Sequence, residues 1–296
     1  MKFLKAFGLA ILGLLLFLSL SVFGLVLTIN QTFLNPEFVV SQVDRLDIAS
    51  LAGEMLSEQV PPEVEQFMGE MVAEVVDDTI ADLEPWMKQQ VSTGIYSFYD
   101  YLEGRSQSLS LVISLEPVKE SLRDNLREAV LESPPPELAG FSPDLIESYL
   151  DTFYQQIPST FELNEASLSP QVMAQLEQAK QFIGYSNIGY QALIGFILLL
   201  ILLIIVINRQ VRGSTRGLGT TFLSCGALSY IGVLVTKNIA GTQLTQLDMP
   251  VYLQAWIPQL LADTLAPLEI YSIGLVAVGV VLLVVSFVYK RGEPSL

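Results

Sequence analysis

The sequence has no histidine and only one cysteine, Cys225. The lack of histidine excludes His-containing catalytic triads, histidine metal sites and the H-E-x-x-H protease motif. A single cysteine cannot form a disulfide within the chain, and Cys225 lies in an apolar run without a histidine to activate it. The sequence also has no G-x-S-x-G, P-loop or G-x-G-x-x-G motif. We therefore expect no enzyme activity, no catalytic residue and no bound cofactor or metal.

Four long runs of the sequence contain no charged residue, over residues 7–29, 189–207, 218–236 and 270–289. A hydrocarbon core of about 30 Å needs about 20 helical residues, so each run can span a bilayer. A cleaved signal peptide is the alternative for the first run. That run is longer than the apolar region of about 7–15 residues in a signal peptide, and no small-x-small cleavage site follows it. We predict an uncleaved signal-anchor helix there and four spans in all.

Basic residues concentrate in the three segments that share one side of the membrane if four helices alternate in direction. These basic residues are Lys2, Lys5, Arg209, Arg212, Arg216, Lys290 and Arg291, and Glu293 is the one acidic residue in those segments. Lys and Arg near the ends of spans favour the cytoplasmic side. We therefore predict a multi-pass plasma-membrane protein with both termini in the cytoplasm.

The spans divide the chain into eight segments. In order, we predict a signal-anchor helix (1–29), an acidic extracytoplasmic helical domain (30–188), a second span (189–208), a basic cytoplasmic link (209–217), a third span (218–236), an extracytoplasmic loop with an amphipathic helix (237–269), a fourth span (270–289) and a cytoplasmic tail (290–296).

The outer segment 30–188 carries 27 acidic and 7 basic residues. Such a surface repels nucleic acid and anionic lipid, so neither is expected as a partner of this face. Two interpretations stay open: the charge keeps the domain soluble, or it binds divalent cations weakly or a basic partner. No calcium-loop spacing supports a specific cation site.

Prolines mark the expected helix starts in the outer domain, because their fixed φ and missing N–H suit a first helical turn. We predict helices over 36–59, 62–82, 85–103, 117–132, 143–155 and 170–185, with Gly104 ending the third and a loop over 133–141. An apolar stripe that includes Val75, Ile80 and Leu83 is expected to face the core.

Residues 108–114 alternate between Leu109, Leu111 and Ile113 on one face and serines with Val112 on the other. This pattern predicts a half-buried strand, which needs a partner for its backbone groups. Residues 159–163 are the expected partner, and a strand from another protomer is the alternative. We expect Val112→Pro to misfold the domain. The predicted fold class is mainly α: a four-helix transmembrane region and an extracytoplasmic helical domain with a small two-stranded β element.

Residues 249–265 have apolar side chains at helical spacing, among them Tyr252, Trp256, Ile257 and Leu260. This helix is expected either to lie along the outer leaflet or to dock on the acidic domain. Gly195, Gly226, Gly232, Gly274 and Gly279 are expected to allow close packing between spans.

The stretches "YDYLEGRSQSLSLVISLEPVKESL" and "IPSTFELNEASL", followed by a helix entering "GYQALIGFILLLILLIIVI", resemble a group of prokaryotic multi-pass membrane proteins of unknown function. The resemblance implies architecture and no activity. From the residues we predict a non-enzymatic membrane protein whose outer domain binds a partner or senses the state of the envelope. The expected partners are membrane lipid and a protein partner or a second copy of the chain.

The sequence leaves two alternative functions. The order of spans also looks like that of permeases of the MacB and FtsX type, which work with a separate ATPase, although the link 209–217 is short for contact with an ATPase. An enzyme acting on lipid or cell wall is a third possibility, for which the sequence offers no residues.

Overall fold

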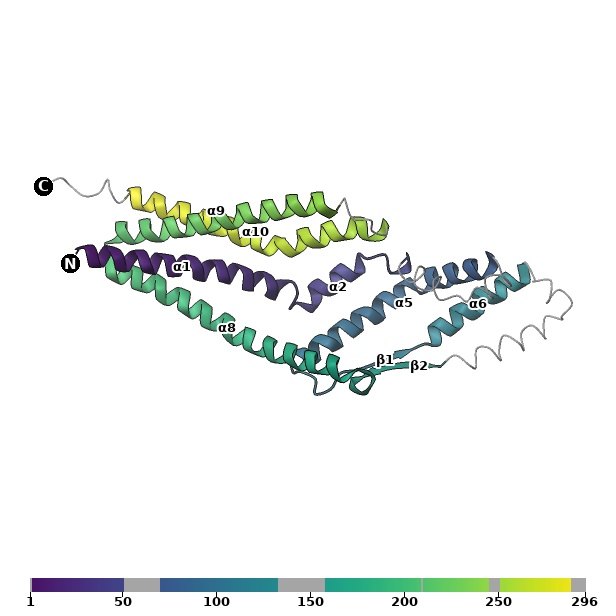
Figure 1. Cartoon of the computed structure of the whole chain (residues 1–296). Helices are drawn as coiled ribbons and strands as arrows, with labels where there is room; N and C mark the ends of the chain where they lie inside the picture. Colours follow the sequence, from purple (N-terminus) through teal and green to yellow (C-terminus); the bar gives the residue numbers. More distant parts are fainter. Residues whose placement is uncertain (1, 51–69, 133–157, 209, 245–250, 289–296) are drawn as a thin grey trace. The chain divides into compact units, whose positions relative to one another are not determined.

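The computed structural model describes residues 2–50, 70–132, 158–208, 210–244 and 251–288 (Figure 1). The chain divides into two compact units: unit 1 contains residues 1–38 and 181–296, and unit 2 contains residues 39–180. The described residues are mainly helical, with one two-stranded antiparallel sheet, as the sequence predicts.

Unit 1 is built from four long helices, and this confirms the predicted number of candidate spans. They are α1 (Lys2–Gln31), the later part of α8 (Pro170–Asn208), α9 (Val211–Leu244) and α10 (Val251–Val288). Each is long and apolar enough to cross a membrane. Large apolar side chains are exposed along the outward faces of all four, as expected of surfaces that contact lipid.

The core of unit 1 is formed where the four helices meet. It consists of Leu16 and Leu20 of α1, Ile197, Leu200 and Ile204 of α8, Leu218 and Cys225 of α9, and Leu275 of α10. Cys225 is fully buried, and its Sγ lies 3.5 Å from Ser21 Oγ. The core also includes Tyr271, whose hydroxyl donates to the Leu20 carbonyl at 2.9 Å.

Helices α9 and α10 run side by side as an antiparallel pair (Figure 1). Their backbones are closest at small residues. A Cβ placed on Gly226 would lie 2.7 Å from the Ser272 carbonyl oxygen, and one on Gly279 would lie 2.6 Å from the Leu223 nitrogen. The predicted packing role is confirmed for these two glycines. It is wrong for Gly195, Gly232 and Gly274, because nothing lies within 4 Å of a Cβ at those positions.

Unit 2 contains α5 (Glu70–Leu102), β1 (Ser110–Ser114), α6 (Glu116–Glu132), β2 (Thr160–Asn164) and the short helix η1 (Glu165–Ser167), followed by the start of α8. Helix α5 packs against α6 and against β1. The predicted stripe on α5 is confirmed, since Val75, Ile80 and Leu83 are buried. Gly104 ends α5 with a φ of 76°, a conformation that glycine adopts without strain.

Several predicted helix boundaries are wrong. The helix α5 continues through Pro85, which has no backbone N–H to donate, and Leu83, two residues before it, is buried. The first outer helix, α2 (Pro36–Asp44), ends well before residue 59. The last one does not stop at residue 185 but continues to Asn208 as α8. The predicted helix 143–155, the loop 133–141 and the tail 290–296 lie outside the described residues.

The described residues of both predicted connections between the later spans are largely helical. Helix α8 ends at Asn208 and α9 begins at Val211, so most of the predicted link 209–217 is helical. At the other end, α9 continues to Leu244 and α10 begins at Val251. The helix predicted over 249–265 is confirmed for its described residues, which form the first turns of α10, and α10 continues through Pro258 and Pro267. Its placement along the outer leaflet or on the acidic domain stays a prediction.

Candidate functional site

The strand pair in unit 2 confirms the predicted partner of β1. Strands β1 and β2 are antiparallel, with Leu111 opposite Leu163 and Ile113 opposite Phe161. The N–H of Leu115 donates to the Ser159 carbonyl at 2.8 Å. Leu111 packs on α5, where its Cδ2 lies 3.2 Å from the Cβ position of Gly94. Val112 (57% exposed) and Phe161 (51% exposed) leave apolar surface on this ribbon uncovered.

A second group of contacts joins the end of α5 to the start of α8 within unit 2. Tyr101 is only 1% exposed, and its hydroxyl donates to Glu177 Oε1 at 3.1 Å. The ammonium of Lys180 lies 4.3 Å from the centre of the Tyr101 ring, a cation–π contact. Burial, and then the hydrogen bond to Glu177, raise the pKa of Tyr101 above its ordinary value. These contacts fasten the end of α5 to the first turns of α8 within unit 2.

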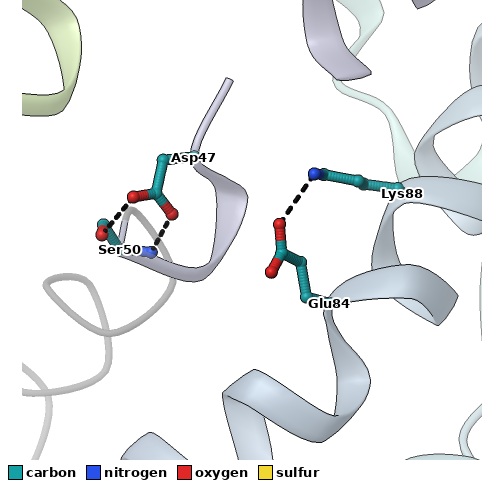
Figure 2. A network of polar contacts seen from close by, with 4 residues as sticks. All are labelled: Asp47, Ser50, Glu84 and Lys88. Carbon is teal, nitrogen blue, oxygen red and sulfur yellow. Dashed lines mark hydrogen bonds and ion pairs between the residues drawn. The ribbon is translucent and has the colours of Figure 1, made fainter. Parts of the chain in front are cut away.

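Figure 2 shows polar contacts near the start of a helical turn in unit 2. Asp47 accepts from the N–H of Ser50 at 2.9 Å and from its hydroxyl at 2.7 Å, which caps the turn that begins at Ile48. These bonds, the one from the N–H first, hold the pKa of Asp47 below its ordinary value. Glu84 and Lys88 form an ion pair of 2.7 Å along α5. All four side chains are occupied in holding local structure.

A further polar contact in unit 2 lies at the start of α6. Glu116, in the first turn of α6, has its pKa lowered by a hydrogen bond from Ser159 and by Lys119, which lies 3.6 Å away. Asp77 and Asp78 are exposed, as expected for charges on a solvated face. Within the described ranges, we find no group of three or more Cys, Asp or Glu side chains that could hold a metal ion.

Three of the seven basic residues predicted to set the topology lie at one end of unit 1, which we call the basic end. There Lys5 Nζ donates to the Asn208 carbonyl at 3.3 Å, which joins the start of α1 to the end of α8. Ser286 Oγ donates to the Arg212 carbonyl at 3.3 Å, which joins the end of α10 to the start of α9. Arg212 and Arg216 are exposed on the first turns of α9.

Not every predicted topology residue can be placed. Lys2 lies at the start of α1, at the same end of the unit, and its side chain is not described. Arg209, Lys290 and Arg291 lie outside the described residues. The structure thus brings Lys5, Arg212 and Arg216 to one end, with the backbone of Lys2.

A cavity of about 540 Å³ opens at the basic end between α1, α8 and α9. We call it the basic-end cavity. Its polar lining comes from Asn208, Arg216, Thr220 and Thr221, and its apolar lining includes Leu9 and Ile204. Gly13 and Gly217 leave room in its wall, since the nearest atom to a Cβ on Gly13 is 3.8 Å away and none lies within 4 Å of one on Gly217.

The opposite end of the α9–α10 pair carries an ion pair. Lys237 Nζ lies 2.5 Å from Glu269 Oε2, and both side chains are about 30% exposed. Among the residues predicted to lie on the membrane or to dock, Trp256, Ile257 and Leu260 are half-buried in α10. Tyr252 belongs to the same helix, and its side chain is not described.

Sequence reasoning missed both the cavity and the Lys237–Glu269 pair. The pair had a usable signal, because the cation directly after the third predicted span and the carboxylate directly before the fourth face each other once the spans form an antiparallel pair. The cavity had no sequence signal. Its lining residues, among them Asn208, Gly217 and Thr220, match no motif and come together only where three helices converge.

Comparison with known proteins adds no relative: no family model, no curated protein and no solved structure matches this chain. The site must be interpreted from its own geometry.

Proposed function

We propose that this chain is a non-enzymatic integral membrane protein of the plasma membrane, whose acidic unit lies outside the cell and binds a protein partner or senses the state of the envelope. The observation that carries the proposal is the separation of charge. Lys5, Arg212 and Arg216 meet at one end of four apolar helices, whereas residues 30–188 have a net charge of −20. Basic ends favour the cytoplasmic side, so the acidic unit lies on the other side.

The partner surface is the β1–β2 ribbon. Val112 exposes apolar area on the face of the ribbon that also carries Glu162, its partner across the strands, in a unit with a large excess of carboxylates. Phe161, opposite Ile113, exposes apolar area on the other face. An exposed apolar side chain with an acidic surround fits a partner that offers an apolar contact within a basic surface. The polar contacts described above hold the unit's own elements together and leave Val112 exposed.

The transport alternative stays a prediction that no observation favours. Permeases that work with an ATPase need cytoplasmic structure for the ATPase to contact. Helix α8 ends at Asn208 and α9 begins at Val211, so the connection between them is very short.

Photocrosslinking in native membranes tests the proposed partner surface. A photoreactive residue at Val112 of the full-length chain should give an adduct with a basic protein, whose yield falls as salt rises from about 0.05 to 0.5 M because screening weakens the attraction. The matched control is Leu198, which is equally exposed (61%) but lies on a candidate span.

The outcomes are distinct. An adduct at Val112 and none at Leu198 supports the proposal. An adduct of the chain with itself would replace the separate partner with a homo-oligomer. Absence of any protein adduct at both Val112 and Phe161 would contradict partner binding at the ribbon.

A further inference from the structure

We propose that the basic-end cavity binds the phosphate-bearing headgroup of an anionic membrane lipid. This inference shares with the proposed function the cytoplasmic position of the basic end, and its other observations come from unit 1 alone. Basic pockets between transmembrane helices on the cytoplasmic side are a known type of site for anionic headgroups. A volume of about 540 Å³ lies within the range of about 300–1,000 Å³ typical of ligand pockets.

The cavity supplies donors where a phosphate would need them. Arg216 lines it, and a guanidinium can bind two phosphate oxygens at once. The Asn208 amide is a second donor, and Lys5 lies at the Asn208 carbonyl. Among the described residues no carboxylate forms an ion pair with Arg216, so its charge is available to a ligand.

The lining changes from polar to apolar along the helices, in the order that a lipid requires. Asn208 is the last residue of α8, and Ile204 lies about one helical turn further from the basic end. On α1, Leu9 and Gly13 follow Lys5 in the same direction. A phosphate beside Arg216 would thus have its first acyl methylenes beside Leu9 and Ile204, whereas a free phosphate gains nothing from that apolar wall.

The charge of the lining selects an anionic lipid over a zwitterionic one. The described lining has one arginine and no carboxylate, so it has no counter-charge for a choline or ethanolamine ammonium. The hydroxyls of Thr220 and Thr221 already donate to the carbonyls of Arg216 and Gly217 at 2.9–3.1 Å. They can only accept from a ligand, so binding of the phosphate falls to Arg216 and Asn208.

Native mass spectrometry of the full-length chain in detergent tests the proposal. The probe is an equimolar mixture of phosphatidylglycerol and phosphatidylcholine with identical acyl chains. We expect the wild type to retain phosphatidylglycerol, and Arg216→Gln to reduce that retention at least five-fold. Arg212→Gln is the matched control, because it removes the same charge one turn away on α9, where the side chain does not line the cavity. Its retention should stay within two-fold of wild type.

A second variant tests whether the volume of the cavity matters, and it leaves the charge of the lining unchanged. Gly217→Leu should fill the cavity and lower retention as strongly as Arg216→Gln, and it should fold because nothing lies within 4 Å of a Cβ at residue 217. Equal losses from Arg212→Gln and Arg216→Gln would overturn the proposal, since they would indicate general attraction to a basic surface. Retention unchanged in Gly217→Leu would also overturn it. Displacement of the lipid by millimolar inorganic phosphate or glycerol phosphate would show that the site takes a soluble phosphate instead.

Discussion

At the scale of the residue, Gly226 and Gly279 lie where the close approach of α9 and α10 leaves no room for a side chain. A methyl group at Gly226 would lie 2.7 Å from the Ser272 carbonyl oxygen and 2.8 Å from the Val276 nitrogen, which are backbone atoms that cannot turn aside. We expect Gly226→Ala to destabilise the helix pair by about 1–3 kcal/mol, the usual cost of overpacking. The measurement is helicity during titration with dodecyl sulfate.

Gly232→Ala on the same helix is the control. No atom lies within 4 Å of its Cβ position, so the substitution should leave stability unchanged or raise it by up to about 1 kcal/mol through helix propensity. If both substitutions shifted the transition equally, the close contact between α9 and α10 would be wrong.

Tyr101 makes unit 2 sensitive to alkaline pH. Its pKa in the folded state is raised by burial and by Glu177, so the folded chain holds the phenol proton more tightly than the unfolded chain. That contribution is fully present below about pH 10, the ordinary tyrosine pKa, and is lost as pH rises from there through the folded pKa. Burial also raises the pKa of Tyr99, so part of the alkaline loss belongs to that residue.

We expect Tyr101→Phe to cost about 1 kcal/mol at pH 7, from the lost hydrogen bond to Glu177, and to reduce the loss of stability between pH 9 and 11. Urea unfolding followed by Trp86 fluorescence, in a Trp256→Phe background, measures both. An alkaline slope identical to that of the parent would show that Tyr101 is not the buried titrating group.

At the scale of the element, the strand pair shows what a sequence can predict. The alternation of Leu109, Leu111 and Ile113 located the strand, and β2 is the expected partner. The same reasoning chose Val112 as the position at which proline would misfold the domain, whereas the register indicates Ile113. In an antiparallel ladder, hydrogen-bonded and non-hydrogen-bonded residue pairs alternate. Leu115 and Ser159 are a hydrogen-bonded pair. The pairs Ile113–Phe161 and Leu111–Leu163 are therefore hydrogen-bonded, and the pair Val112–Glu162 is not.

Proline substitutions in β1 should therefore differ by position. Ile113→Pro removes an N–H that points at β2, whereas the N–H of Val112 points away from β2. We therefore expect Val112→Pro to have a mild effect in place of the misfolding predicted from the sequence. Limited proteolysis of the full-length chain should show unit 2 cut much faster in Ile113→Pro than in Val112→Pro. Ile113→Ala controls for the lost side chain. Equal sensitivity of the two proline variants would show that the register is wrong.

Helix boundaries were harder to predict for a physical reason. Proline is favoured in a first turn and tolerated inside a helix where packing offsets the lost hydrogen bond, and local sequence does not distinguish these cases. Pro36 and Pro170 begin α2 and α8, but Pro85, Pro258 and Pro267 lie inside α5 and α10. The four spans were predictable because length and lack of charge suffice. The basic-end cavity was not, because it depends on three helices converging.

At the scale of the whole molecule, the proposed function requires the basic end and the acidic residues 30–188 to lie on opposite sides of a membrane. Four apolar helices explain how the chain is held in a bilayer. The basic end and the acidic residues 30–188 would then lie on opposite sides, the first toward anionic lipid and the second toward a basic partner. The proposed function assumes this orientation. The proposed lipid site gains from it, because basic pockets for anionic headgroups are known on the cytoplasmic side.

Thiol labelling in intact cells tests that orientation most directly. In a Cys225→Ser background the chain has no other cysteine, so single cysteines can be placed at exposed positions: Ser108→Cys in unit 2 and Gln210→Cys between α8 and α9. A membrane-impermeant maleimide should label the cysteine at residue 108 in intact cells, and the cysteine at residue 210 only after the membrane is permeabilised. Labelling of residue 210 in intact cells, with residue 108 protected, would contradict the account.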